Sequence, residues 1–303
     1  MPWESAAELD PYRDEPAQMP SGVVGKNGYL KLGFVKRPQR TILAELDRRV
    51  PLFVHKALYW DEAMPELACV FLISTSSGIC QGDRGRFEFT VGAGARAHIT
   101  TQSNTQIHSM DCNYAAQTQD IVLHEDAYLE FLPDPICPHR GARFFSQTRV
   151  RAHPGATLIY SEILQPGRRH HHQDELFGYE LFSSRLQVEN LEGKLLMSEK
   201  FLLEPKKQPL QRQLLMGDFE VFANVLLVTP PDQAAAILAA TPALYDRSAG
   251  LAAGASVLPN QAGLLYKVLG RESAPVQEMV RKFWATVRRQ VLDRPVRAAF
   301  LWR

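Results

Sequence analysis

The sequence predicts a mainly β fold that is elongated, built from stacked β-strands in a β-helical-type arrangement, and completed by a few α-helices near the C-terminus. Three observations lead to this prediction. From Gly28 onward, apolar and polar residues alternate with a period of two, as in half-buried strands. A unit made of a turn and a strand recurs about every 30 residues. Helical periodicity appears only in the last quarter of the chain.

The first 25 residues differ from the rest in composition. They carry four prolines among acidic and small residues and can bury little apolar surface. We therefore expect residues 1–25 to form a flexible N-terminal arm. The remaining residues, 26–303, are expected to form one β-rich domain that includes the C-terminal helices.

Alternation is clearest in the strand predicted around residues 86–91. One face would carry Phe87, Phe89 and Val91, and the other face would carry Arg86, Glu88 and Thr90. The pattern continues after the Gly92-Ala93-Gly94 reversal, and it returns near residues 127–131 and 195–203. These segments are expected to pair as strands with one buried face.

The repeated unit consists of a turn followed by a strand. It reads Gly94-Ala95-Arg96-Ala97, then Asp126-Ala127-Tyr128-Leu129, then Gly155-Ala156-Thr157-Leu158. The alanines are 32 and then 29 residues apart. A turn that recurs at the same position of each repeat is typical of stacked strand pairs, but a plain β-meander with common turns also fits this pattern.

Two helices are predicted. Asp232 would cap a short Ala-rich helix over residues 233–240. The longer helix begins near Ser273, has Pro275 in its first turn and shows an apolar stripe at i, i+3, i+4 spacing through residue 291. The chain then ends in an apolar tail that must dock on this core or on a partner.

Composition excludes several classes of function. The formal net charge is +1, which offers no electrostatic basis for binding nucleic acid or an anionic membrane. No apolar run approaches the roughly 20 residues of a membrane span, and the N-terminus does not read as a signal peptide. The four cysteines are irregularly spaced, so we expect reduced thiols in a cytoplasmic protein.

Several segments together resemble one protein family. Residues 77–105 read SGICQGDRGRFEFTVGAGARAHITTQSNT, residues 129–133 read LEFLP, and residues 161–164 read SEIL before Gly167-Arg168. In this order and spacing they resemble the UreD family, also called UreH, of urease accessory proteins. The resemblance covers about 270 of the 303 residues and favours the stacked, β-helical-type architecture.

The resemblance implies a scaffold rather than an enzyme. Such a protein would bridge apo-urease to the partners UreF and UreG and help deliver nickel to the urease active site through an internal passage. No P-loop stands in this sequence, so GTP hydrolysis in such a complex would belong to UreG. No tightly bound cofactor is expected, only nickel in transit, and neither nucleic acid nor a membrane is an expected partner.

Four carboxylates are the candidates for handling nickel in transit: Asp83, Glu130, Glu162 and Glu175. Oxygen ligands bind nickel weakly and exchange it quickly, which suits a conduit. Each could instead form a salt bridge or cap a turn, and this alternative is strongest for Asp83, which follows a glycine. The candidates for partner binding are Phe283, Trp284, Arg288 and Trp302, on the long helix and the tail.

Histidines leave other functions open. The run from His170 to His172 can bind a metal or form an exposed polar loop. Five of the six other histidines stand singly on different predicted strands: His98, His108, His124, His139 and His153. If they converged, the chain could be a β-rich metal-dependent hydrolase. A carbohydrate-binding module that stacks sugars on Tyr59 or Trp60 is a third alternative.

Overall fold

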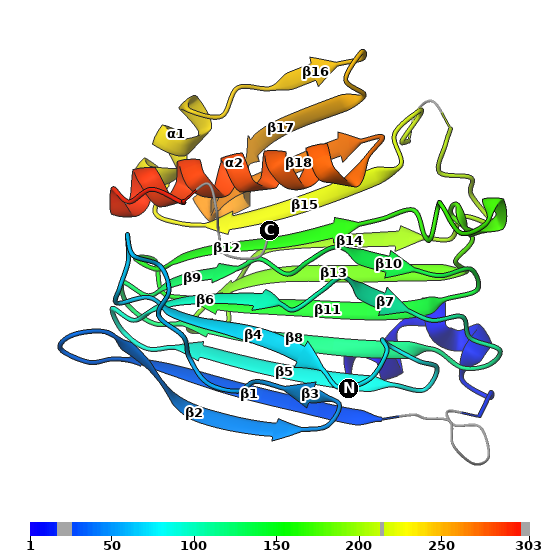
Figure 1. Ribbon diagram of the computed structural model, residues 1–303, viewed down its shortest axis with the longest axis horizontal. Coiled ribbons are helices and arrows are strands. Elements are labelled where there is room, and N and C mark those ends of the chain that lie inside the picture. Colours follow the sequence, from blue (N-terminus) through cyan, green and yellow to red (C-terminus); the bar gives the residue numbers. More distant parts are fainter. Residues whose placement is uncertain (17–25, 213–214, 298–303) are drawn as a thin grey trace.

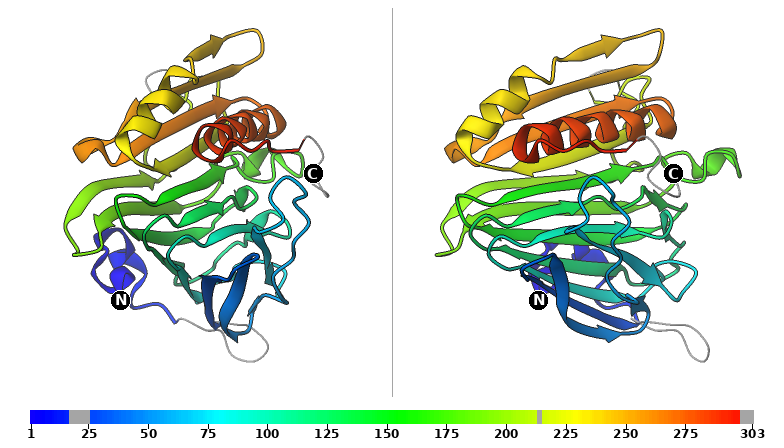
Figure 2. Two further views of the ribbon diagram at one scale, coloured as in Figure 1. Left: turned by 90° about the vertical axis from the view of Figure 1, so that its left-hand side faces the viewer. Right: turned by 60° about the vertical axis from the view of Figure 1, so that its left-hand side comes forward.

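The computed structural model of the chain describes residues 1–16, 26–212 and 215–297. Two β-sheets lie face to face in it and bury apolar side chains between them, with a helical layer at one end (Figures 1 and 2). Each sheet contributes its inward-pointing residues to this core, as the period of two predicts. The sequence prediction of a mainly β fold is therefore confirmed.

The first sheet has seven strands among the described residues, in the order β14-β13-β11-β8-β5-β1-β2. Their bounds are Leu195–Leu203, Leu181–Asn190, Arg143–Ala152, Ala115–Leu123, Arg84–Val91, Asn27–Lys36 and Thr41–Arg49, in that order. The five strands from β13 to β1 run parallel, and the two edge strands are antiparallel to their neighbours.

The second sheet follows the order β16-β17-β18-β15-β12-β9-β6-β4-β3. The bounds are Leu244–Asp246, Leu251–Val257, Gly263–Gly270, Val221–Val228, Thr157–Leu164, Tyr128–Phe131, Arg96–Thr101, Ala68–Ser74 and Leu52–Phe53. Two short strands lie beside this row, β7 at Thr105–Ile107 and β10 at Ile136–Pro138. Strands β4, β6, β9 and β12 are parallel, whereas the others in the row are antiparallel.

The repeated sequence unit corresponds to strands that stack side by side. Ala97 of β6 pairs with Leu129 of β9, which in turn pairs with Leu158 of β12. The three copies of the unit therefore stack in parallel and not as a meander, and between them the chain crosses to the first sheet. The two sheets are not closed into one coil, however, and antiparallel strands extend both of them. A β-helical architecture for the whole chain is thus not confirmed.

Helices near the C-terminus cover one face of β15 and β18 (Figure 1). The long helix, α2, spans Ser273–Leu292, as the apolar stripe predicts. Its Phe283 ring stacks on Tyr266 of β18 with ring centroids 4.5 Å apart. The short helix, α1, spans Pro231–Ala239. Asp232 is not its cap, because Pro230 occupies that position and Pro231 begins the helix; Asp232 lies inside the first turn instead.

The N-terminal residues differ from the predicted flexible arm. Residues 2–12 form two short 3-10 helices, Pro2–Ser5 and Ala7–Tyr12, on the outer side of the first sheet (Figure 2). Trp3 and Leu9 are buried there against residues of β8, β11 and β13. Average composition hides this packing, because a few well-spaced apolar side chains are enough to dock a short segment. The second part of the predicted arm, residues 17–25, lies outside the described residues.

Candidate functional site

A band of polar side chains crosses the interior of the first sheet. Paired residues of neighbouring strands form rows across the sheet. One inward-facing row consists of Gly85, Gln117, Ser146 and Ser184. The inward-facing row two residues farther along the strands contains Phe87, Gln119 and Thr148. The flanking positions on either side belong to two separate apolar clusters. Burying polar groups without hydrogen-bond partners costs free energy, so a polar band between two apolar clusters is not expected from packing alone.

Hydrogen bonds tie the band together only in part. The Gln119 amide donates to Thr148 Oγ1 at 2.9 Å and to the Tyr160 hydroxyl at 3.3 Å. The Gln117 amide donates to Ser146 Oγ at 3.3 Å. These contacts join β8 and β11 to β12 of the opposite sheet, so the band spans the space between the two sheets.

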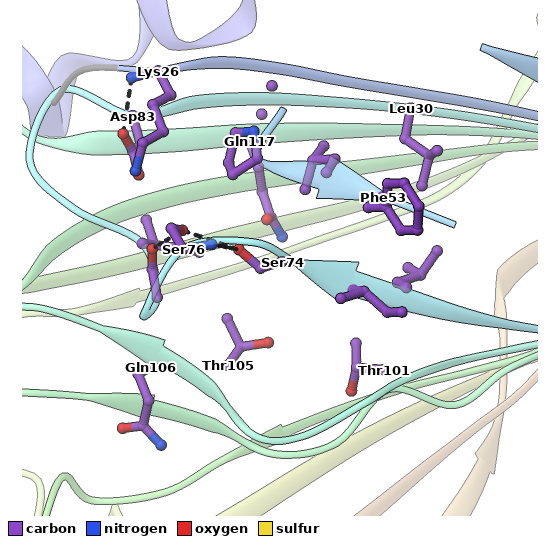
Figure 3. Close-up of a pocket in the computed structure, with 18 of the residues that line it drawn as sticks. Lys26, Leu30, Phe53, Ser74, Ser76, Asp83, Thr101, Thr105, Gln106 and Gln117 are labelled. Carbon is purple, nitrogen blue, oxygen red and sulfur yellow. Dashed lines mark hydrogen bonds between the residues drawn. The ribbon is translucent and has the colours of Figure 1, made fainter. Parts of the chain in front are cut away.

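Two cavities meet along this band. The larger, of about 180 Å³, is lined by Lys26 and Asp83 together with Gln117 and Thr101 (Figure 3). The smaller, of about 70 Å³, reaches Glu162. The cavities share six lining residues: Leu72, Phe87, Thr101, Thr105, Gln117 and Phe144. Asp83 therefore lines one of two adjoining cavities, and Glu162 lines the other.

Glu162 is a buried carboxyl group on β12 without a cationic partner among the described residues. Its exposed fraction is 8%, and Ser184 donates a hydrogen bond to its Oε2 at 3.1 Å. Burial, together with the nearby Glu199 charge, raises the pKa of Glu162 to about 7, although the hydrogen bonds from Ser184 and Tyr160 act to lower it. The group can therefore gain or lose a proton near neutral pH.

The polar band continues past Glu162 toward the surface. Glu162 pairs across the second sheet with Asn224, which pairs with Lys267. The Asn224 amide donates to Glu199 at 2.8 Å, and Lys267 forms a 2.6 Å ion pair with the same carboxylate. Asn224 Oδ1 is buried and accepts no hydrogen bond within the described part of the chain. Lys267 is partly exposed, so polar groups extend from Glu162 to solvent.

Asp83 holds a turn in the wall of the larger cavity. Its Oδ1 accepts the backbone N–H of Lys26, and its Oδ2 accepts that of Cys80, both at 2.9 Å. Burial raises the pKa of Asp83, and those two hydrogen bonds act against the increase. Asp83 is thus the turn cap that the sequence offered as an alternative, and it also lines the cavity.

Glu130 lies elsewhere, in a closed ion network beneath α2. Arg288 donates to both of its oxygens, from Nε at 2.7 Å and from Nη2 at 2.8 Å, and also pairs with the buried Asp61. His98 and Tyr128 complete the shell at 2.8 and 2.7 Å. Burial alone would raise the pKa of Glu130, but the Arg288 charge and these hydrogen bonds hold it well below its usual range.

Glu175 holds a loop at the end of the molecule. Arg168 pairs with its Oε1 at 2.5 Å, and the backbone N–H of Arg140 donates to its Oε2 at 3.0 Å. Burial raises the carboxyl pKa, yet these two hydrogen bonds outweigh it and leave the pKa below its ordinary value. His171 and His172 of the histidine run are exposed nearby.

The predicted carboxylates are therefore distributed over three places. Of the four, Asp83 and Glu162 line the two adjoining cavities, whereas Glu130 and Glu175 are saturated by cations and N–H donors. Over the ranges that the structure describes, no group of three or more His, Cys, Asp or Glu residues is arranged to hold a metal ion.

The residues predicted to bind partners are placed inside the molecule. Phe283, Trp284 and Arg288 are 2%, 6% and 0% exposed. Direct contact with a partner would require these side chains to leave the core. Trp302 lies outside the described residues.

Sequence reasoning missed most of the band: Gln117, Gln119, Tyr160, Ser184, Glu199 and Asn224. One signal was present for the two glutamines. They occupy the same alternating positions as Ile121 and Leu123, which are buried, so polar residues stood where the strand pattern demands apolar ones. The other residues carry no comparable local signal.

Comparison with known proteins decides the family. The family described as "UreD urease accessory protein" matches residues 26–303. The chain belongs to the UreD family. Among similar proteins are urease accessory protein UreD of Yersinia pseudotuberculosis, 52% identical over 99% of this chain and 93% of that protein, and UreD 2 of Brucella canis, 50% identical over 98% of each. Photorhabdus laumondii UreD is 49% identical over 99% of this chain and 93% of that protein.

Membership confirms the resemblance seen in the sequence for nearly the whole chain. In the portion of this UreD-family chain that is described, no helix is long and apolar enough to cross a membrane.

Proposed function

We propose that this UreD-family chain acts in urease maturation as a scaffold that bridges apo-urease to UreF and UreG, and that nickel passes through its interior on the way to urease. Family membership supports the accessory role. The observation that supports the passage is a pair of adjoining cavities along a polar band, one lined by Asp83 and the other by Glu162.

The chemistry of the band suits an ion in transit. Amide, hydroxyl and carboxylate oxygens offer weak ligands that exchange readily, and water can fill the remaining positions on the ion. Because the pKa of Glu162 is about 7, its carboxyl can release a proton as a cation arrives and take one up as the cation leaves. No covalent step is required.

Glu130 and Glu175 are structural in this proposal. Their oxygens already accept several short hydrogen bonds from cations or N–H groups, and neither residue lines the two adjoining cavities. A metal ion would have to displace Arg288 or Arg168 to reach them. The passage is therefore assigned to Asp83, Glu162 and the polar side chains between them.

A paired substitution tests the passage. Asp83→Leu combined with Glu162→Leu removes the carboxylates at both ends and narrows the route with apolar bulk. Urease co-expressed with this variant should contain much less nickel and show much less activity than urease matured by the unchanged chain. Asp120→Leu is the matched control, because Asp120 lies on β8 next to Gln119 but points to the opposite face and pairs with Arg149.

Pull-down of UreF and UreG accompanies the assay. Loss of nickel loading with an intact complex supports the passage. Full loading by the double variant contradicts it, and loss of the complex would show that these carboxylates are needed for the fold instead.

The C-terminal region is proposed to support the surface that meets UreF. Because Phe283, Trp284 and Arg288 are buried, their part is to hold α2 in place on the second sheet. Deleting residues 292–303 should weaken capture of UreF while far-ultraviolet circular dichroism stays typical of β structure. If the truncated chain captures UreF as well as the full chain does, the tail is not part of the interface.

The alternative of a metal-dependent hydrolase gains no support. Such a site needs three converging protein ligands, and the described residues offer no group of that size. The rings of His108 and His139 do lie close together, 4.9 Å apart between centroids, but His98 is hydrogen-bonded to Glu130 instead.

A further inference from the structure

The outer face of the first sheet carries an apolar patch beneath the N-terminal residues (Figure 2). Its members lie at or next to the starts of the parallel strands β8, β11 and β13: Tyr114, Ala116, Phe145 and Leu181. All four are buried, and the apolar side chains packed against them come from the N-terminal 3-10 helices: Trp3, Ala6, Leu9 and Tyr12. Residues 1–16 are called the cover below, and the four residues beneath it are called the covered face.

The cover adds no strand to the sheet that it lies on. Its backbone-to-backbone hydrogen bonds stay within the cover, for example from the Leu9 N–H to the Ala6 carbonyl at 3.0 Å. Every hydrogen bond between the cover and the rest of the described chain involves a side chain. Lifting the cover would therefore break no backbone ladder of the first sheet, and segments held in this way open at a lower free energy than paired strands do.

Charges around the covered face are opposite to those of the cover. Residues 1–16 include five acidic residues and one basic residue. Glu8 forms a 2.9 Å ion pair with Lys200 of β14 and accepts a 2.5 Å hydrogen bond from the Ser183 hydroxyl. Glu15 forms a 2.9 Å ion pair with Arg143 of β11. The covered face thus has an apolar centre and a cationic rim, so it fits a segment that combines apolar side chains with carboxylates.

The covered face and the C-terminal helix α2 lie on different sheets. Helix α2 packs on β15 and β18 of the second sheet, whereas the covered face belongs to the first sheet. Figures 1 and 2 show the cover and α2 on different sides of the molecule. A bridging scaffold needs two separate surfaces. Because the C-terminal region is proposed to support the surface for UreF, the covered face is available for the second partner, apo-urease.

We propose that the covered face is a docking surface for apo-urease, and that the cover occupies it until an acidic segment of apo-urease with an apolar anchor displaces the cover. The choice of apo-urease rests on the proposed function. The cover itself shows which chemistry the face accepts, because Glu8 and Leu9 supply a carboxylate and a buried apolar side chain side by side. Since cover and partner compete for one face, the apparent affinity for apo-urease is reduced by the fraction of chains whose face is open.

Weakening the cover should strengthen the binding of apo-urease. Leu9→Ala in the full chain removes a fully buried side chain of the cover and leaves the covered face unchanged. We expect the apparent affinity for apo-urease, measured by surface plasmon resonance, to rise by about tenfold, and capture of UreF to stay the same. A cover that only stabilises the fold would give an unchanged or lower affinity. Glu4→Ala is the matched control, because Glu4 is exposed on the cover and pairs with the N-terminal amino group; it should bind as the unchanged chain does.

A synthetic peptide of residues 1–16 tests the covered face directly. Added to the Leu9→Ala chain, the peptide should replace the weakened cover and reduce the binding of apo-urease. The same peptide with Trp3→Ala and Leu9→Ala should not compete, because it lacks both large apolar side chains that are buried against the face. Neither peptide should alter capture of UreF.

Four outcomes would overturn the proposal. Two of them are an unchanged or lowered affinity of Leu9→Ala for apo-urease and the absence of competition by the unmodified peptide. Increased capture of UreF by Leu9→Ala would assign the face to UreF, and a dimer of this variant in size-exclusion chromatography would assign it to a second copy of the chain.

Failure of this proposal and failure of the bridging function are distinguishable. If apo-urease binds the unchanged chain, but neither Leu9→Ala nor the peptide alters that binding, the bridge stands and the docking surface is wrong. If apo-urease binds no form of the chain, both are wrong. Circular dichroism shows whether each variant is folded. If Leu9→Ala does not fold, Glu8→Gln decides the outcome, because it removes only the charge that faces Lys200 and should raise the affinity in the same direction, by about threefold.

Discussion

Two buried glutamates of this chain, Glu130 and Glu162, lie on neighbouring strands of one sheet and have opposite surroundings. Glu130 accepts hydrogen bonds from Arg288, His98 and Tyr128, and its pKa is held well below the ordinary value. Glu162 has hydroxyl donors and no cation among the described residues, and its pKa rises to about 7. A saturated carboxylate is a fixed part of the structure, whereas an undersaturated one beside a cavity is free to take a ligand.

Removing the cation of the Glu130 network should have the largest effect on stability. Arg288→Met leaves Glu130 and Asp61 as uncompensated buried charges, which typically costs about 3–5 kcal/mol. Urea denaturation measures the loss. The neighbouring Arg289→Met is the matched control, since Arg289 is exposed, and it should change stability by no more than about 0.5 kcal/mol. Equal effects of the two substitutions would show that the network contributes little.

Neutralising Glu162 should act in the opposite direction. The folded chain binds the Glu162 proton up to pH about 7, whereas an ordinary glutamate releases it near 4.5, so the folded state binds more protons in this window. Stability therefore falls as pH rises from about 4.5 to 7, and the penalty, about 3 kcal/mol, is complete above pH 7. Glu162→Gln should remove the penalty. The unfolding free energies of the two chains should converge near pH 4.5 and differ most above pH 8; a difference that is constant with pH would contradict the raised pKa.

Tyr128→Phe probes the Glu130 network without removing a charge. The Tyr128 hydroxyl donates to Glu130 at 2.7 Å, and a hydrogen bond to a charged group is worth about 2 kcal/mol. Because Glu130 stays ionised, this loss should be the same at pH 6 and at pH 8. A loss that changes between these two pH values would mean that Glu130 titrates in the neutral range.

Ser184→Ala is the corresponding probe beside Glu162. Loss of its hydrogen bond should cost about 1 kcal/mol above pH 7 and less at pH 5, because the bond is stronger to the ionised carboxylate. The same change should raise the pKa of Glu162 further, which nuclear magnetic resonance of the labelled carboxyl carbon can measure. A lowered pKa would contradict the assigned role of Ser184.

Sequence patterns predicted the local elements well. The apolar stripe over residues 273–291 corresponds to α2, and the 32- and 29-residue spacing corresponds to strands paired in parallel at that register. Both signals are local, since helix and strand periods appear within a few residues and a repeat needs only copies of one unit. The packing of Trp3 and Leu9 has no local sequence signal, because it depends on a surface made by distant strands.

The same restriction to local signals explains why the sequence alone did not define the candidate site. Asp83 and Glu162 were candidates from the sequence, but so were Glu130 and Glu175, and nothing local separates the four. Arg288, which determines the role of Glu130, is 158 residues away, and His108 meets His139 only because β7 pairs with β10. A carboxylate's function depends on what surrounds it.

By itself, then, the sequence determined the strand and helix pattern, the repeat and the family. Tertiary structure alone decided which buried carboxylates are neutralised, which face connected cavities and which histidines meet. The physical reason is the separation along the sequence over which each effect acts. Backbone geometry and side-chain periodicity act over a few residues, whereas desolvation, ion pairing and cavity shape depend on groups that only the folded chain brings within a few ångströms.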